Sequence, residues 1–297
     1  MGHSSYSSHT RSARAETKGY HTKPAEQIFE SSMNNAMSPH GVTLREARDS
    51  EAHPCSIPIF LGLDTTGSMG PIPLFLVRNG LPHMVETIIK AGIPDPQVLF
   101  TGIGDHECDR APLQIGQYES GDEELDHWLT TLWLEGNGGG NYGESYLLAW
   151  FFAALYTAHD HFEKRGKKGL LFTIGDEPTL KELPARAQKA LMGDGQYSDI
   201  TSAELLDKAR ETYEVFHLHM LQGSKGLRPE VQDGWKQLLG DDHVIMVQDK
   251  ADVAQIIADT VLKVVNAQNS GTTQAPGPQD VQQKDDDGDG GDGPMML

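Results

Sequence analysis

Oxygen-bearing side chains gather in one short turn of the chain. The stretch LGLDTTGSMG, residues 61–70, places Asp64, Thr66 and Ser68 directly after an apolar run. Carboxylate and hydroxyl oxygens are the ligands that hard divalent cations prefer in proteins. The same residue types also form ordinary turns and helix N-caps. This stretch alone therefore leaves metal binding and a purely structural role both open.

Three other polar loops follow apolar runs in the same way. LEGNGGGNYGESYLLAW, residues 134–150, contains Asn141 behind three glycines, which allow a close approach of the backbone. Asn141 and Glu144 also have the spacing of a capping box at a helix start. LLFTIGDEPT presents Asp176 directly after a run that ends at Ile174, and LFTGIGDHECDR presents Asp105 in the same manner.

Short β-rich runs alternate with longer helical patterns through the middle of the chain. This alternation predicts an α/β fold with a mostly parallel central sheet and helices on both faces. The nearly continuous apolar character of the runs is typical of strands buried on both faces. The expected strands are 57–63, 98–103, 170–174, 213–220 and 243–247, with 112–120 as an antiparallel edge strand or a loop. The expected helices are 73–91, 122–133, 142–158, 202–212, 229–239 and 251–269.

The polar loops should meet in this fold. Right-handed crossovers bring the carboxyl ends of parallel strands to one edge of the sheet, where α/β proteins collect ligands. A site of hydroxyls and carboxylates, without cysteine or paired histidine, suits Mg²⁺ better than a calcium cage. The sequence therefore predicts a Mg²⁺ (or Mn²⁺) site at this edge.

Composition limits the classes of protein that this chain can represent. It has 297 residues, a formal charge of −19 and only two cysteines, Cys55 and Cys108. The acidic charge disfavours nucleic acid and anionic membrane surfaces as partners. No apolar run is long enough for a membrane helix and the polar start lacks the core of a secretory signal, so we expect a cytoplasmic protein in a reduced compartment.

Shifts in composition predict four segments along the chain. Residues 1–23 and the acidic stretch 270–297 have too little apolar content to offset the entropy of ordering, and we expect both to be disordered. Residues 24–55 carry scattered apolar side chains and should lie over the domain as an ordered arm. Residues 56–269 then form the α/β domain.

The pattern Asp64-x-Thr66-x-Ser68 resembles the metal-ion-dependent adhesion site (MIDAS) of von Willebrand factor type A (vWA) domains, which have a Rossmann-like fold. The resemblance covers about residues 57–265. It implies that Thr66 and Ser68 ligate the metal directly, that Asp64 holds them and bound water, and that Asp176 completes the set. Asn141 stands where the family commonly has a threonine, and Thr66 stands where serine is commoner.

The resemblance also implies a function. In this family, an acidic side chain of a partner protein fills an open coordination position of the metal, so the site recognises and does not catalyse. The sequence around these motifs is similar to that of bacterial and phage stand-alone members of the family. Some intracellular members work as adaptors of MoxR-type AAA+ ATPases, which makes such an ATPase one possible partner class.

The sequence leaves two other functions open. A metal-dependent hydrolase of phosphate esters could use Asp64 as a nucleophile, but Thr66 stands where the haloacid-dehalogenase type has its general acid. A metal-free interaction scaffold is the second alternative. The phosphate-loop, nucleophile-elbow and His-Glu-x-x-His motifs are absent from the sequence. His217 and His219 have a spacing compatible with metal, but a packed strand accounts for them better.

Overall fold

A six-stranded sheet forms the centre of the protein in the computed structural model, which describes residues 5–67, 69, 71–136 and 141–271. The strand order is β10-β9-β6-β2-β3-β4, and every neighbouring pair is parallel except β3 and β4. The strands are β2 (Ile57–Asp64), β3 (Pro96–Ile103), β4 (Leu113–Ile115), β6 (Gly169–Gly175), β9 (Tyr213–Met220) and β10 (Val244–Val247). The predicted α/β class is confirmed, and the stretch 112–120 supplies the antiparallel edge strand.

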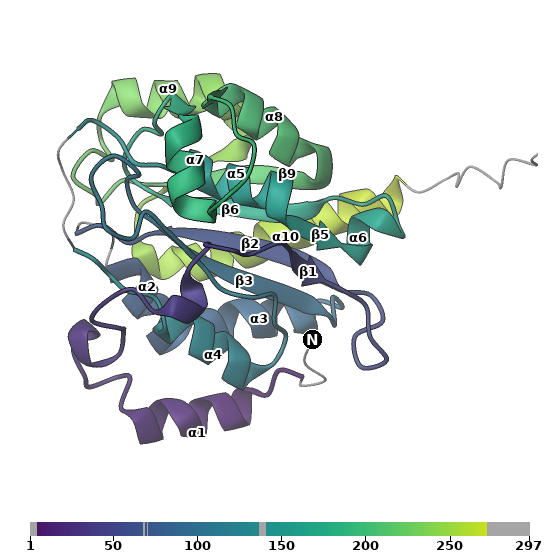
Figure 1. The fold of residues 1–297 in the computed structure, drawn as a ribbon. Helices are drawn as coiled ribbons and strands as arrows, with labels where there is room; N and C mark the ends of the chain where they lie inside the picture. The colour runs from purple at the N-terminus through teal and green to yellow at the C-terminus, as the bar shows by residue number, and fades with distance from the viewer. Residues whose placement is uncertain (1–4, 68, 70, 137–140, 272–297) are drawn as a thin grey trace, which may run out of the picture.

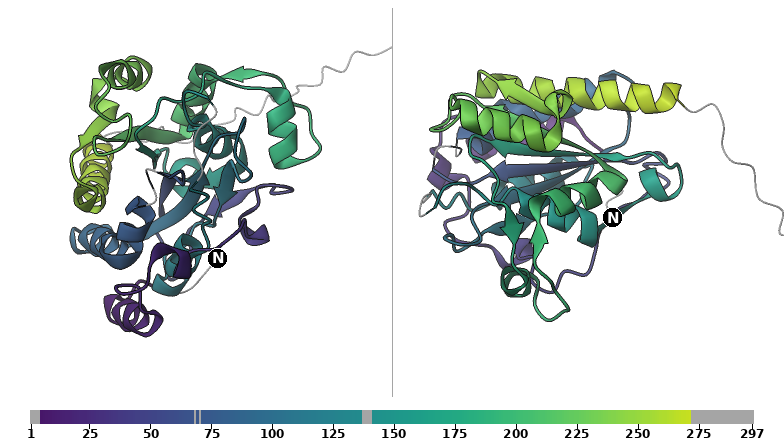
Figure 2. Two further views of the ribbon diagram at one scale, coloured as in Figure 1. Left: turned by 90° about the vertical axis from the view of Figure 1, so that its left-hand side faces the viewer. Right: turned by 90° about the horizontal axis from the view of Figure 1, so that it is seen from above.

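Helices cover both faces of this sheet (Figure 1). Successive strand residues alternate between the two layers, because Ile59 and Leu61 belong to one hydrophobic cluster and Phe60 to the other. One layer contains α2 (Pro71–Phe75), α3 (Leu81–Lys90), α4 (Asp122–Thr130) and α10 (Val253–Ser270). The other contains α5 (Leu147–Tyr156), α7 (Ala185–Met192), α8 (Ser202–Thr212) and α9 (Pro229–Leu239). Figure 2 shows the sheet between these layers from two further sides.

The helix expected over residues 73–91 is divided by a wide turn. Between α2 and α3 lies the π-helical segment η3 (Leu76–Gly80). Pro82, in the first turn of α3, has no backbone N–H to donate to the preceding turn, and a π turn is one way in which a helix absorbs such a break. The division therefore follows from a residue inside the predicted helix.

The first residues of the chain differ from the expectation of disorder over 1–23. Residues 8–18 form helix α1 (Ser8–Lys18), which lies outside α3 and α4 (Figure 1). Arg11 in this helix is 1% exposed and pairs with the buried Asp126 of α4 at 2.8 Å. The apolar content is low, as the sequence suggests, but a buried ion pair and the buried Ala15 and Tyr20 attach the helix to the domain.

Residues 24–55 lie over the domain. Phe29 and Met37 are buried; Phe29 follows the 3₁₀ turn η1 (Ala25–Gln27), and Met37 ends the 3₁₀ turn η2 (Asn35–Met37). Strand β1 (Arg45–Ala47) pairs in parallel with β5 (Thr157–His159). The expected acidic tail, 270–297, falls from residue 272 onward outside the described residues.

Several short elements complete the fold. They are α6 (Asp160–Glu163), the antiparallel pair β7 (Glu182–Leu183) and β8 (Ile200–Thr201), and the 3₁₀ turns η4 (Asp241–His243) and η5 (Lys250–Asp252). Within the described ranges, no helix combines the length and the apolar character needed to cross a membrane.

Candidate metal centre

The two aspartates of the predicted site lie at the ends of neighbouring strands. Asp64 is the last residue of β2, and Asp176 directly follows β6. Strand β2 pairs with β3 on one side and with β6 on the other, so the strand order reverses at this place. In open α/β sheets, ligands bind outside the carboxyl ends of the strands at such a reversal. Both side chains are buried, with exposed fractions of 1% and 0%.

Asp64 and Thr66 form a local hydrogen-bonded turn. The Oδ1 atom of Asp64 accepts hydrogen bonds from the Thr66 backbone N–H at 2.9 Å and from the Thr66 hydroxyl at 2.5 Å. The Oδ2 atom accepts a third hydrogen bond, at 2.7 Å, from the hydroxyl of Tyr146. The turn itself is encoded within three residues, whereas Tyr146 arrives from a distant loop.

The loop after β9 supplies the partners of Asp176. Its Oδ2 atom accepts hydrogen bonds from the backbone N–H of Lys225 at 2.9 Å and from the Ser224 hydroxyl at 3.3 Å. Gly223 lies so close that an added Cβ would be 2.3 Å from the Asp176 side chain. Neither the loop nor its glycine stands out in the sequence, because its role depends on contacts across 48 or 49 positions of the chain.

Burial makes ionisation of the Asp64 carboxyl group less favourable. Desolvation raises the pKa of Asp64 to about 6, and the nearby charge of Asp176 adds to this rise. The hydrogen bonds from Thr66 and Tyr146 act in the opposite direction but do not compensate for burial. A divalent cation would suit this environment, because its positive charge would offset the cost of ionising the buried Asp64 carboxyl group.

Glu144 adds a third buried carboxylate to this region. It is 4% exposed, and its Oε2 atom has no hydrogen-bond partner among the described residues. Desolvation first, and then the charges of Asp64 and other acidic groups, raise the pKa of Glu144 to about 10. The capping box that its spacing with Asn141 suggests does not form, since α5 begins at Leu147 and Tyr146 occupies the N-cap position.

The other residues named from the sequence take different places. The Asn141 side-chain amide donates to Glu107 at 2.8 Å in an exposed position, and among the described residues it makes no hydrogen bond to Asp64 or Thr66. Asp105 accepts from the Glu107 backbone N–H and from the Ser145 hydroxyl. Ser68 lies outside the described residues. The structure thus joins Asp64 to Thr66 by hydrogen bonds, places Asp176 at the end of the neighbouring strand, and directs the Asn141 amide toward Glu107.

The donor set fits a hard cation that keeps part of its water shell. Asp64, Thr66 and Asp176 offer only oxygen atoms, which favours Mg²⁺ or Mn²⁺ over the softer transition metals. In the part of the chain that the structure describes, no three histidine, cysteine, aspartate or glutamate side chains form a metal-holding group. A metal site here would therefore depend on hydroxyl and water oxygens in addition to carboxylates.

The paired histidines of β9 are packed within the core. The His217 ring stacks on Trp235 with 3.6 Å between centroids, and its Nδ1 atom lies 2.9 Å from the Thr173 hydroxyl. His219 donates from Nε2 to the Gly226 carbonyl at 2.9 Å. Burial lowers the pKa of both imidazoles, so they are neutral near pH 7. The packed-strand interpretation of these residues is confirmed.

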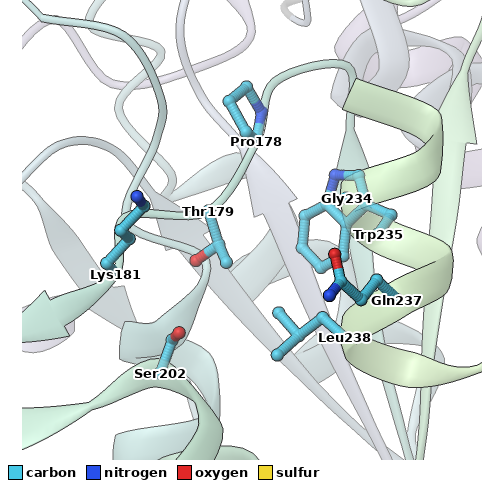
Figure 3. A pocket seen from close by; sticks show the side chains of 8 residues that line it. All are labelled: Pro178, Thr179, Lys181, Ser202, Gly234, Trp235, Gln237 and Leu238. Carbon is cyan, nitrogen blue, oxygen red and sulfur yellow. The ribbon is translucent and has the colours of Figure 1, made fainter. Parts of the chain in front are cut away.

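A cavity of about 430 Å³ opens beside the chain segment that follows Asp176 (Figure 3). Its lining comes from that segment, from α8 and from α9: Pro178, Thr179, Lys181, Ser202, Gly234, Trp235, Gln237 and Leu238. The indole N–H of Trp235 donates to the Glu177 carbonyl at 2.8 Å and so ties α9 to this segment. Asp64, Thr66 and Asp176 do not line the cavity, which is therefore separate from the carboxylate group.

Comparisons with known proteins give only a general likeness of architecture. No family model and no curated protein sequence matches this chain. One similar solved structure is the pilus adhesin SpaC from Lactobacillus rhamnosus GG in its open conformation. It is 12% identical over 71% of this chain, with a TM-score of 0.47, and the match spans only 30% of SpaC.

Two smaller structures match over nearly their whole length. The vWF domain of the type V pili tip protein Mfa5 from Porphyromonas gingivalis is 10% identical over 76% of this chain and 96% of its own, with a TM-score of 0.43. BatB from Bacteroides thetaiotaomicron is 13% identical over 71% of this chain and 99% of its own, with a TM-score of 0.40. At these identities and TM-scores, the likenesses say nothing about metals, activity or partners.

Proposed function

We propose that this chain is a vWA-type binding domain that holds Mg²⁺ or Mn²⁺ through Asp64, Thr66, Ser68 and Asp176 and uses the ion to capture a carboxylate of a partner protein. The proposal is for recognition and not for catalysis. Asn141 is left out of this set because its amide is engaged by Glu107. Ser68 is retained from the sequence pattern.

The observation that carries the proposal is the environment of Asp64. Among the described residues, the hydrogen bonds to its carboxylate come from hydroxyls and a backbone N–H, and none comes from a cationic side chain. Its charge is buried next to that of Asp176 at a reversal of strand order. A bound divalent ion would neutralise these charges and present an open position to an incoming carboxylate.

Calorimetric titration of Mg²⁺ and Mn²⁺ tests the metal site. Wild-type protein should bind either ion, and Asp64→Asn should bind it at least tenfold more weakly, because the substitution removes one of the two charges that hold the ion. Asp207→Asn is the matched control, since Asp207 is exposed on α8 and should not affect binding. Equal binding by wild type and Asp64→Asn would refute the metal assignment.

A capture experiment tests recognition separately. Protein immobilised in Mg²⁺ should retain a partner that is lost in chelator, and Asp64→Asn should fail to retain it in either condition. Retention that is equal in Mg²⁺ and chelator would favour the metal-free scaffold and reject the proposal. A MoxR-type AAA+ ATPase finds no support in the comparisons, so the partner is defined here only by its acidic side chain.

A further inference from the structure

The wide turn η3 leaves one buried backbone carbonyl without a helical donor. The Leu81 N–H donates to the Leu76 carbonyl, five positions back, whereas in an α-helix it would donate to the Val77 carbonyl. In π geometry the donor to Val77 would be residue 82, and Pro82 has no N–H. Val77 is fully buried, with an exposed fraction of 0%. Its carbonyl needs a donor from another part of the chain, because an unpaired buried carbonyl costs free energy.

Arg11 of the N-terminal helix α1 supplies that donor. Its Nη2 atom donates a hydrogen bond to the Val77 carbonyl across 66 positions of the chain. Its Nε atom lies 2.8 Å from the Oδ1 atom of Asp126 on α4. The planar guanidinium carries several N–H donors in a fixed fork, so one group serves both partners. Arg11 is only 1% exposed, and this burial keeps water from replacing it at the carbonyl.

Contacts in the opposite direction tie the wide turn to the segment that follows α1. Arg78, within η3, donates from Nε to the Tyr20 carbonyl and from Nη2 to the Lys23 carbonyl, both at 2.9 Å. Tyr20 is 3% exposed and belongs to the hydrophobic cluster on this face of the sheet. The turn and the N-terminal segment therefore hold each other through two arginines, one from each side.

The choice between a π turn and an α turn decides which carbonyl lacks a donor. In an unbroken α-helix, Leu81 would donate to Val77, and Pro82 would leave the Arg78 carbonyl unpaired. Arg78 is only partly buried, whereas Val77 is fully buried. The π turn thus moves the unpaired carbonyl from a partly exposed residue to the interior, where Arg11 is its donor. Without Arg11, the α register would carry the smaller penalty.

This register also determines the position of the turn that follows β2. The Ile72 N–H donates to the Met69 carbonyl at 2.9 Å, and the Met69 N–H donates to the Thr66 carbonyl at 3.0 Å. These hydrogen bonds join the Thr66 turn to α2, which continues directly into η3. A change of register by one residue corresponds to a rotation of about 100° and a shift of about 1.5 Å along the helix axis. Residues 66–75 would therefore move relative to α3.

We infer that α1 fixes the wide-turn register through Arg11, which makes Arg11 a positioning residue for residues 66–75. Detachment of α1 would remove the donor of the Val77 carbonyl and favour the α register. The inference goes beyond the proposed function, because neither the turn nor its test involves a metal ion.

A double-mutant cycle tests the role of Arg11 as a substitute donor. Arg11→Lys keeps a positive charge for Asp126 but loses the fork, and it should raise the unfolding equilibrium constant in urea titrations about 5- to 30-fold. Pro82→Ala restores a backbone N–H, so in that background Arg11→Lys should change the constant less than about threefold. Arg14→Lys is the matched control: Arg14 lies in the same helix and contacts α4, so its effect should be equal in both backgrounds. Equal effects of Arg11→Lys in both backgrounds would overturn the inference.

Nuclear magnetic resonance measures the register itself. Wild type should show a through-hydrogen-bond coupling between the Leu81 amide nitrogen and the Leu76 carbonyl carbon. In Arg11→Lys this coupling should move to the Val77 carbonyl carbon. Circular dichroism and thermal unfolding verify that the variant is folded. A coupling that stays at Leu76 in the folded variant would also overturn the inference.

Discussion

Replacing Asp64 by asparagine should have opposite effects on stability with and without metal. The amide oxygen can still accept the two hydrogen bonds from Thr66, and the amide N–H can donate to the Tyr146 oxygen, so the local geometry can be kept. What changes is the charge. In chelator the variant should be more stable than wild type near pH 7, because a buried carboxylate no longer has to ionise.

The size and pH range of this effect follow from the pKa of Asp64. Folding raises that pKa from the ordinary value of 3.8 to about 6, and this difference corresponds to about 3 kcal/mol. Below pH 3.8 the side chain is protonated in both states, so the penalty is absent. Between pH 3.8 and about 6 the unfolded chain loses its proton first, and wild-type stability falls as the pH rises. Above about pH 6 the penalty is complete and constant.

Urea unfolding followed by circular dichroism measures this difference. In chelator, Asp64→Asn should exceed wild type by about 3 kcal/mol at pH 7.5 and by much less near pH 4. With Mg²⁺ at a hundred times its Kd, wild type should gain about 2.7 kcal/mol and the variant far less. A variant that is no more stable than wild type at pH 7.5 in chelator would contradict the penalty derived from burial. An equal gain from Mg²⁺ would contradict the role of Asp64 as a ligand.

Three further substitutions, one of them a control, test contacts that support the fold and the site. Arg11→Ala should lower the free energy of unfolding by about 1–3 kcal/mol in urea titrations, because the buried Asp126 would lose its partner at 2.8 Å and keep only Arg14, at 3.3 Å. A loss below about 0.5 kcal/mol would show that the Arg11–Asp126 pair contributes little to stability. Gly175→Ala should lower the free energy of unfolding by about 1–3 kcal/mol, since the new Cβ would lie 1.8 Å from the Tyr146 hydroxyl. Gly234 lies in helix α9, and nothing lies within 4 Å of a Cβ added there, so Gly234→Ala should instead raise the free energy of unfolding by about 0.5–1 kcal/mol. Equal effects of the two glycine substitutions would refute the argument from close packing.

The sequence by itself determined the features that depend only on residues close together along the chain. The apolar runs of β2, β3, β6 and β9 are continuous because these strands are buried on both faces, and hydrophobic pattern alone locates them to within two residues. The turn from Asp64 to Thr66 is likewise local, since its hydrogen bonds span two positions. The rule that parallel strands share a carboxyl edge then places Asp176 near this turn.

Features that depend on desolvation were decided by the tertiary structure. Helix α1 has few apolar residues, and its attachment rests on the pairing of Arg11 with Asp126, 115 positions away. Glu144 has the spacing of a capping residue, yet it is buried, and its backbone N–H and C=O pair with the segment after Asp176. The physical reason is that hydrogen-bonded turns and hydrophobic periodicity are encoded within a few residues, whereas the burial of a charge depends on which distant segments close around it.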